Sequence, residues 1–262
     1  MFNFCSLYSG SSGNCLYVET DNTKLLIDAG VSLKKILEGL DSINIEPSSL
    51  DGVLVTHEHS DHIKSLGALS KKFDLPVFAN QETFNAMPKQ VEKISDKNIK
   101  KFNINETFCI NDIEINPFSI HHDAANPCGF NFINNDKKIS IATDIGHIDN
   151  KILKQLDGSS FILLESNYDP EVLKYTKYPF ALKQRIAGPN GHLPNNIAGK
   201  VINYLLNNGL NTAMLGHLSK ESNFPALAYQ TVADEIISSG TDISKINLSV
   251  ASRDTVGDII HI

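Results

Sequence analysis

Several features are missing from this 262-residue sequence, and each absence excludes a class of protein. The four cysteines contain no CxxC pair, so neither a thiolate zinc site nor a disulfide framework is indicated, and we expect buried free thiols at Cys5, Cys15, Cys109 and Cys128. No uninterrupted apolar run approaches the roughly 20 residues of a membrane span. The first residues also lack the basic start of a targeting peptide. We therefore expect a soluble, cytoplasmic protein with no membrane partner.

An excess of positive charge is lacking as well. Lys and Arg number 23 against 30 Asp and Glu, which gives a net charge of -7 and a pI near 5.7. Such a balance does not suit a protein coated for nonspecific binding of polyanions. The basic residues form small dispersed groups, and only the group at 183–185 lies near a chemical motif. Any nucleic acid must therefore be attracted locally.

The remaining composition is that of an ordinary globular protein, with 41% hydrophobic and 20% charged residues. We find no internal repeat, low-complexity tract or linker. A single domain over residues 1–262 is therefore expected. The pattern of elements alone restricts the fold only to α/β or α+β.

Short apolar runs predict strands, and apolar residues at helical spacing predict helices. Strands are expected at residues 2–7, 16–19, 24–27, 53–55, 77–79, 161–164 and 212–215. Residues 107–118 and 129–142 are typical of two hairpins, the second turning at 134–136. Helices are expected after the N-cap residue Ser32, in one stretch after residue 62, and at 148–157, 195–207 and 226–238.

The most informative motif reads Thr-His-Glu-His-Ser-Asp-His over residues 56–62, directly after an expected strand. It places four possible metal ligands in six positions: His57, His59, Asp61 and His62. On a strand-to-helix loop, His57 and His59 would point at one ion, while Asp61 and His62 would turn toward a second. The plain alternative is a set of surface polar residues or hydrogen-bonded core histidines, but this density favours a metal site.

Further ligand candidates follow other apolar strands, where the loops at one edge of a sandwich would bring side chains together. They are the pair His121-His122, then Asp144, then His217. A carboxylate can bridge two ions because its two oxygens reach different metals, whereas a neutral imidazole offers one lone pair. Asp28 ends another strand directly before Ala29-Gly30, where an aspartate can stabilise a turn; its alternative role, orienting a metal ligand, is one that the family resemblance below implies.

The 57–62 motif resembles the HxHxDH signature of the metallo-β-lactamase superfamily, and the downstream ligands fill the remaining positions of that pattern. The resemblance implies an α/β fold, the αββα four-layer sandwich, over essentially the whole chain. It assigns one metal to His57, His59, His122 and Asp144, and the other to Asp61, His62, Asp144 and His217. His122 is preferred over His121 because the family pattern places the ligand immediately before Asp123.

Two divalent ions about 3.5 to 4 Å apart would lower the pKa of a shared water and supply hydroxide at neutral pH. The expected reaction is therefore hydrolysis, with Asp61 both binding metal and holding the nucleophile. Redox chemistry is disfavoured because di-iron relatives of this fold carry a carboxylate where this chain has His59. Nitrogen and oxygen ligands suit zinc or manganese, and iron is also acceptable.

A second pair of residues is expected to serve the leaving group. Glu165 follows a strand and His192 precedes a helix, and together they resemble motifs of the tRNA 3′-processing nuclease branch, RNase Z. A histidine oriented by a glutamate can protonate a departing oxygen, which a phosphodiester requires. The alternative is that Glu165 only ends its strand and His192 only caps the next helix.

The substrate is expected to contact a Gly/Ser-rich loop at residues 8–14, whose amides and hydroxyls suit phosphate oxygens. We select Ser11, Ser12 and Asn14 from it, and add Arg185, whose planar guanidinium suits phosphate. These segments, with those at 122–127, 165–167 and 216–221, resemble the YycJ/WalJ group of bacterial hydrolases. That resemblance implies a 5′-to-3′ exonuclease acting on DNA, although Tyr168 and Pro194 stand where the group often has histidine and serine.

Two other functions stay open at this point. A small-molecule hydrolase of the same superfamily, such as a cyclic phosphodiesterase or a thioesterase, fits the acidic net charge. A nonenzymatic protein that keeps metals for folding is less favoured, because structural zinc sites are closed tetrahedra and usually rich in thiolates. The sequence does not fix the oligomeric state.

Overall fold

The computed structural model describes all 262 residues and divides them into two compact units. Unit 1 comprises residues 1–119, 124–136 and 252–262, and unit 2 comprises 120–123 and 137–251. The chain therefore passes between the units four times, so neither unit is one continuous segment. The single domain expected over residues 1–262 remains a prediction, and each unit is described by itself.

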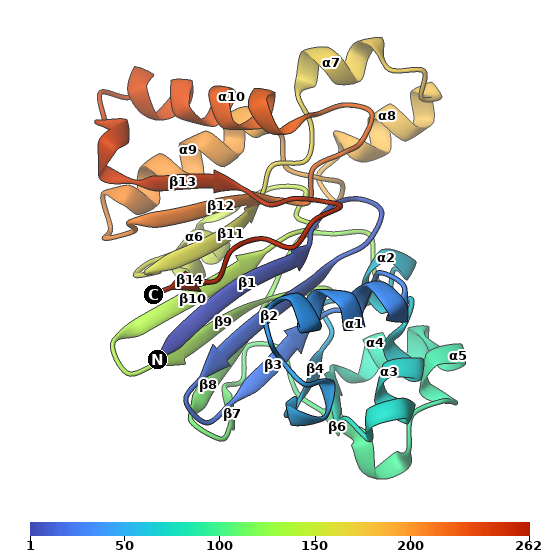
Figure 1. The fold of residues 1–262 in the computed structure, drawn as a ribbon. Helices are drawn as coiled ribbons and strands as arrows, with labels where there is room; N and C mark the ends of the chain where they lie inside the picture. Colours follow the sequence, from blue (N-terminus) through green and yellow to red (C-terminus); the bar gives the residue numbers. More distant parts are fainter. The chain divides into compact units, whose positions relative to one another are not determined.

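Unit 1 is built on a seven-stranded sheet in the order β14-β1-β2-β3-β4-β5-β6 (Figure 1). The strands are β1 (Phe2–Tyr8), β2 (Cys15–Thr20), β3 (Lys24–Ile27), β4 (Gly52–Leu54), β5 (Val77–Ala79), β6 (Ile99–Lys101) and β14 (Ile260–His261). Pairing is antiparallel from β14 to β3 and parallel from β3 to β6. The central strands are almost wholly buried, as their continuous apolar runs require.

The same unit contains three further antiparallel strands, β7 (Phe108–Ile110), β8 (Ile113–Ser119) and β9 (Cys128–Asn134). The first predicted hairpin is confirmed by β7 and β8. The second predicted hairpin would join β9 to β10 (Lys137–Ala142), and these two strands belong to different units. Its pairing remains a prediction.

The helices of unit 1 are α1 (Leu33–Ser42), α2 (Ser60–Ile63), α3 (Leu66–Phe73), α4 (Gln81–Ala86) and α5 (Pro88–Val91). Ser32 caps α1 as predicted, because its side chain accepts a hydrogen bond from the Lys35 amide. The prediction of a single helix after residue 62 was wrong, since two separate helices, α2 and α3, are present there. Ser65 interrupts them because its amide donates to Ala29 O and its hydroxyl to Val31 O, at 2.9 and 2.6 Å.

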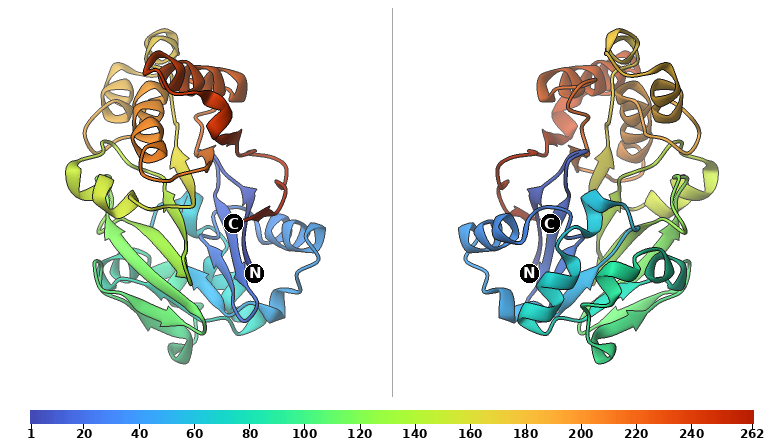
Figure 2. Two further views of the ribbon diagram at one scale, coloured as in Figure 1. Left: turned by 90° about the vertical axis from the view of Figure 1, so that its left-hand side faces the viewer. Right: turned by 90° about the vertical axis from the view of Figure 1, so that its right-hand side faces the viewer.

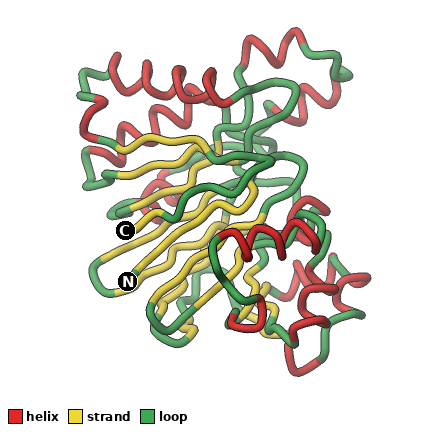
Figure 3. Tube along the Cα trace, viewed as in Figure 1, coloured by secondary structure: helices red, strands yellow, loops and turns green.

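Unit 2 contains four parallel strands, β10, β11 (Phe161–Glu165), β12 (Thr212–Gly216) and β13 (Asn247–Val250). Three predicted helices are confirmed as α6 (Asn150–Leu156), α9 (Asn195–Leu206) and α10 (Pro225–Ser238). In both views of Figure 2, α9 and α10 lie side by side. Two short helices, α7 (Pro170–Tyr175) and α8 (Phe180–Ile186), were not predicted, and Figure 3 shows them as a helical excursion with a loop between them.

The cysteines are free, as expected, but one of them is not buried. Cys109 is exposed on β7, because side chains of an antiparallel strand alternate between the two faces of the sheet. No helix in the structure combines the length and apolar character needed to cross a membrane.

Candidate metal centre

In unit 1, the histidine motif spans the loop after β4 and the first residues of α2, as predicted, with His57 and His59 in the loop and Asp61 and His62 in the helix. His57 and His62 are completely buried, with their ring centroids 4.1 Å apart. His57 Nε2 lies 3.1 Å from His59 Nδ1, and Asp61 Oδ2 lies 3.6 Å from His62 Nε2. The first four predicted ligands therefore form one cluster of nitrogen and oxygen donors.

Asp28 orients this cluster. Its carboxylate lies 2.7 Å from His62 Nδ1 and accepts hydrogen bonds from the amide and the hydroxyl of Thr56, both at 2.9 Å. With Nδ1 donating to Asp28, His62 has the tautomer whose Nε2 carries the lone pair that a metal ligand needs. Asp28 also has a φ of 63°, so the two roles left open by the sequence are combined in one residue.

Gly30 allows the Asp28 turn to approach the ligand loop closely. A Cβ atom at Gly30 would lie 1.6 Å from the carbonyl oxygen of Asp61 and 2.8 Å from the His62 amide nitrogen. The backbones are joined next to this contact, where the Ala29 amide donates to His62 O at 2.7 Å. Only glycine fits here without moving the ligands.

The Gly/Ser-rich loop packs against the same ligands. The side chain of Asn14 is buried, with Oδ1 accepting from the Gly10 amide at 3.0 Å and Nδ2 lying 3.1 Å from His62 Nε2. Ser11 and Ser12 are exposed at the tip of the loop. Asn14 thus holds the loop against His62, and Ser11 and Ser12 are solvent-exposed on the same loop.

Arg253 was missed by the sequence analysis, because it lies more than 200 positions from this loop and in no motif. The Ser9 amide donates to Ser252 O at 3.0 Å, which brings the C-terminal segment onto the loop. A Cβ atom at Gly10 would lie 2.9 Å from Arg253 Nε, so the guanidinium group packs directly on the Gly10 backbone. The positively charged guanidinium of Arg253 therefore lies against this loop.

In unit 2, the other predicted ligands lie just beyond the ends of parallel strands. Asp144 follows β10 and His217 follows β12, and both adopt the left-handed backbone conformation, with φ of 56° and 55°. Such a conformation is uncommon for a residue other than glycine, and it turns each side chain sharply away from its strand. Asp144 Oδ1 lies 3.5 Å from His217 Nε2 and 3.7 Å from His122 Nε2.

The two adjacent histidines, His121 and His122, point in different directions. His122 is buried beside Asp144, and its Nδ1 lies 3.1 Å from Gly191 O. His121 contacts Asp149 at 3.1 Å and stacks on the ring of His147, with centroids 3.9 Å apart. Within unit 2, His122 is therefore the member of the pair that lies with the other predicted ligands.

Glu165 is the centre of the unit 2 cluster. Its Oε1 lies 2.8 Å from His192 Nδ1 and 2.7 Å from His217 Nδ1, while Oε2 accepts from the amides of Ile145 and Leu193 at 2.8 and 3.0 Å. Sequence analysis paired Glu165 only with His192. The geometry adds His217, so one carboxylate orients both the predicted acid and a predicted ligand.

These contacts also set the ionisation of the pair. Complete burial raises the pKa of Glu165, but the charges and hydrogen bonds of His192 and His217 outweigh it and hold that pKa well below its usual range. Burial lowers the pKa of His192, but the Glu165 carboxylate outweighs burial and raises it. For His122 the effect of burial exceeds the opposing effect of the Asp144 and Glu165 charges, so its pKa is lowered. The neutral, metal-binding form of this imidazole is therefore favoured.

Arg185, a predicted substrate ligand, lies on α8, and its Nε is 2.5 Å from Asp123 Oδ2. Its side chain is 58% exposed, so the guanidinium can contact a ligand while the ion pair holds it in place. Asp123 also donates its amide to Asn190 O, two residues before His192. Arg185 is thus tied to the segment that carries the predicted acid.

Both clusters fit divalent metal ions. Asp144, Glu165, His192 and His217 offer donor atoms that all lie within 4.8 Å of one another. The donors of both units are imidazole nitrogens and carboxylate oxygens without a thiolate, which suits zinc, manganese or iron. Carboxylates on the far ring nitrogens of His62 and His217 orient these side chains as second partners do in metal centres.

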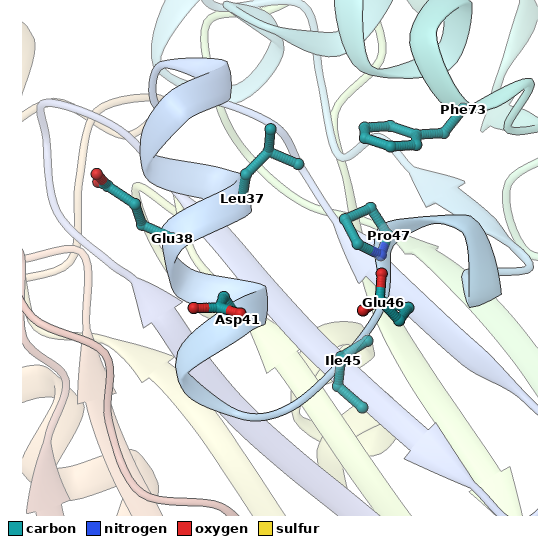
Figure 4. Close-up of a pocket in the computed structure, with 7 residues that line it drawn as sticks. All are labelled: Leu37, Glu38, Asp41, Ile45, Glu46, Pro47 and Phe73. Carbon is teal, nitrogen blue, oxygen red and sulfur yellow. The ribbon is translucent and has the colours of Figure 1, made fainter.

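A pocket of about 370 Å³ lies elsewhere in unit 1 (Figure 4). It is lined by one side of α1, the segment after it and one residue of α3: Leu37, Glu38, Asp41, Ile45, Glu46, Pro47 and Phe73. It contains carboxylates and apolar side chains but no histidine, cysteine, lysine or arginine. It therefore offers no catalytic group that rivals the two clusters.

Comparison with known families gives the decisive observation. The profile described as "Beta-lactamase superfamily domain" matches residues 23–217, a stretch that contains all seven predicted metal ligands. The chain belongs to the β-lactamase superfamily. The predicted family is thereby confirmed, and with it an enzyme of the metallo-hydrolase type.

Two curated members of the superfamily are similar along nearly the whole chain. Exodeoxyribonuclease WalJ of Streptococcus pneumoniae is 38% identical over 237 residues, which are 90% of this chain and 88% of the relative. Exodeoxyribonuclease YycJ of Bacillus anthracis is 37% identical over 243 residues, covering 93% and 92%. The predicted resemblance to the YycJ/WalJ group is confirmed.

Solved structures of the superfamily share the fold. The metallo-β-lactamase fold protein YhfI of Bacillus subtilis matches with a TM-score of 0.73 at 15% identity, covering 98% of this chain and 100% of its own. Human tRNase Z, short form, matches with a TM-score of 0.67 at 13% identity, covering 99% and 100%. The predicted αββα sandwich is therefore the fold class of this superfamily member.

Proposed function

We propose that this protein is a metal-dependent exodeoxyribonuclease that cleaves phosphodiester bonds of DNA from the 5′ end. The observation that carries this proposal is similarity at 37–38% identity, along about nine tenths of the chain, to two proteins named exodeoxyribonucleases. The orientation of His192 by Glu165 adds to it, because cleavage of a phosphodiester is helped by an acid that protonates the alkoxide leaving group.

The proposed centre holds two divalent ions. One would be bound by His57, His59, His122 and Asp144, and the other by Asp61, His62, Asp144 and His217. Support comes from the two clusters, each of which groups its own donors, and from membership in the superfamily. When bound, the ions would activate water and neutralise charge on a phosphate oxygen.

The residues of the chain would then supply position and protons. Asp61 would hold the attacking water, since its carboxylate lies beside His62 and is only partly exposed. His192 would donate the proton that leaves with the departing 3′ oxygen, and Glu165 would keep it protonated and correctly turned. Glu165 would also fix His217, which couples metal binding to proton donation.

The substrate phosphates would contact the loop residues Ser11 and Ser12, with Arg253 as the cation beside them. Asn14 would act mainly by holding this loop against His62. Arg185 would contact a phosphate from unit 2. The cytoplasm is the proposed location, because DNA is found there in bacteria and four free thiols suit a reducing compartment.

The test is the cleavage of end-labelled DNA by metal-loaded protein. We expect shortening of single- or double-stranded DNA with zinc or manganese, and loss of at least about 100-fold in rate for His59→Ala, because a metal ligand is removed. His261→Ala is the matched control, since that imidazole contacts Asn3 at 2.8 Å and no predicted ligand. The position of the label shows from which end the DNA is cleaved.

An absence of metal-dependent shortening would contradict the proposal. Faster hydrolysis of cyclic nucleotides or thioesters than of DNA would favour the small-molecule alternative.

A further inference from the structure

The α7–α8 excursion, residues 170–186 and here named the arm, exposes aromatic side chains to an unusual degree. Tyr175 is 86% exposed and Phe180 is 73% exposed, which are larger fractions than for any other exposed aromatic residue of the chain. No residue of α8 is buried, and α7 buries only Leu173. Packing within the protein therefore does not explain why these aromatic rings are here.

The arm also differs in charge from the rest of the chain. It has four basic residues and one acidic residue, Glu171, which forms an exposed ion pair with Lys174 at 2.5 Å, so the arm is net positive whereas the whole chain has a net charge of -7. Lys174 and Lys177 are exposed and alternate with the aromatic residues, in the order Lys174, Tyr175, Lys177, Tyr178 and Phe180. Basic side chains interleaved with aromatic rings are the combination with which proteins bind single-stranded nucleic acid.

The two ends of the arm are fixed at the Glu165–His192 pair. The chain leaves β11 through Asn167, whose amide donates to Leu193 O at 2.8 Å, and returns where the Asn195 amide donates to Tyr168 O at 3.0 Å. The end of α8 lies directly on the acid, because the His192 amide donates to Ile186 O at 2.9 Å. A Cβ atom at Gly191 would lie 2.2 Å from Arg185 O, so no larger residue fits between them.

We propose that the arm binds a single-stranded segment of DNA, with bases stacked on Tyr175 and Phe180 and phosphates contacting Lys174 and Lys177. This inference rests on the proposed function for the identity of the nucleic acid and extends it by naming the surface that holds the strand. Stacking on aromatic rings tolerates any base, which an exonuclease requires as its substrate moves. Because the last residue of α8, Ile186, accepts a hydrogen bond from the His192 amide, a strand held on the arm is held on the element that leads to the proton donor.

The test is the affinity of the whole protein for a 5′-fluorescent oligothymidylate of about 20 nucleotides, measured by anisotropy in EDTA so that no cleavage occurs. For Tyr175→Ala/Phe180→Ala we expect about tenfold or greater weakening, as stacked bases are lost. For Lys174→Gln/Lys177→Gln we expect a salt dependence of log K that is less steep by about 1.4, from two lost phosphate contacts. The four positions are exposed, and an unchanged melting temperature will show that the variants are folded.

The matched controls are Tyr204→Ala, an aromatic residue 42% exposed on α9, and Lys100→Gln/Lys101→Gln on β6. They should bind the oligonucleotide like the wild type. Equal affinity and equal salt dependence in arm and control variants would overturn the inference. So would binding to anionic phospholipid vesicles that the arm variants lose while oligonucleotide binding is kept. Wild-type cleavage of DNA is measured separately, so failure of the arm and failure of the proposed function are distinguishable.

Discussion

At the scale of single residues, two buried carboxylates organise the predicted centre without being predicted ligands. Asp28 fixes His62 in unit 1, and Glu165 fixes His192 and His217 in unit 2. In each case the carboxylate accepts from the ring nitrogen that faces away from the metal side, which selects the tautomer a metal ligand needs. The sequence indicated both residues, but the number of partners of each came only from the structure.

Replacing Glu165 by glutamine tests its role toward His192. The pKa of His192 is raised by Glu165, so in Glu165→Gln the imidazole should lose its proton at lower pH. We expect the alkaline limb of the pH–rate profile for DNA to move to lower pH, and the rate to fall by about 100-fold or more. Hydrolysis of bis-p-nitrophenyl phosphate, whose leaving group needs no proton, should fall much less. Equal losses on both substrates, with the metal content of the variant shown to match that of the wild type, would show that Glu165 does not act through His192.

Replacing Gly30 by alanine tests the close approach to Asp61. The added methyl group would overlap the Asp61 carbonyl, so the ligand loop must move. We expect a loss of about 2 to 3 kcal/mol in the free energy of unfolding and weaker metal binding. Gly257→Ala is the matched control, because the nearest atom there is 3.4 Å away. Wild-type stability and metal affinity in Gly30→Ala would contradict this packing.

At the scale of elements, the sequence predicted most strands and helices because continuous apolar runs and helical spacing report burial. The sequence-based prediction failed where contacts between distant segments determine the local structure. The helix after residue 62 breaks at Ser65 because that residue donates two hydrogen bonds to the turn after β3. The arm was missed because its short helices bury almost nothing, so they have no apolar period to detect. Arg253 was missed because only folding brings it to the loop.

The turn between β7 and β8 is joined to the turn between β2 and β3 by Asp112. Its carboxylate accepts from the hydroxyls of Thr20 and Thr23 at 2.6 and 2.5 Å. Burial raises the pKa of Asp112, but these hydrogen bonds and one from Asn22 outweigh it, so the net pKa is lowered from 3.8. The stabilisation is therefore present above the unfolded pKa and is lost as the pH falls through the folded one.

Asp112→Asn should lower the free energy of unfolding at pH 7 by about 1 to 2 kcal/mol, the contribution of hydrogen bonds to a charged group. Urea unfolding of both proteins checks this. The difference between them should shrink as the pH is lowered below about 4, where the wild-type carboxyl becomes protonated. A difference that stays constant down to about pH 2 would show that the charge of Asp112 is not involved.

At the scale of the whole molecule, the predicted metal ligands are shared between two units that the chain joins by four passages. The donors of unit 1 come from one loop and the short helix α2 that follows it, while those of unit 2 come from the ends of several strands. The residue types predicted a metal centre because seven ligands match one superfamily pattern. Their spacing along the chain cannot give the coordination of each ion, since that depends on how distant loops fold.

Metal removal should therefore lower the thermal stability of the whole protein. Ions that bind only the folded state stabilise it by mass action, by about 2.7 kcal/mol at a free metal concentration 100 times the Kd. For a chain of this size that corresponds to a rise in melting temperature of about 5 to 10 °C. Calorimetry in EDTA and after reloading should show this difference in the wild type and a much smaller one in His59→Ala. An equal melting temperature with and without metal would show that the ligands do not bind ions as a folded set.

The most direct measurement is anomalous X-ray diffraction from crystals of the protein reloaded with zinc or manganese. Our account predicts two strong peaks about 3.5 to 4 Å apart. One should be bound by His57, His59 and His122, the other by Asp61, His62 and His217, with Asp144 between them. A single peak bound by residues of one unit only, or peaks away from these side chains, would contradict the account.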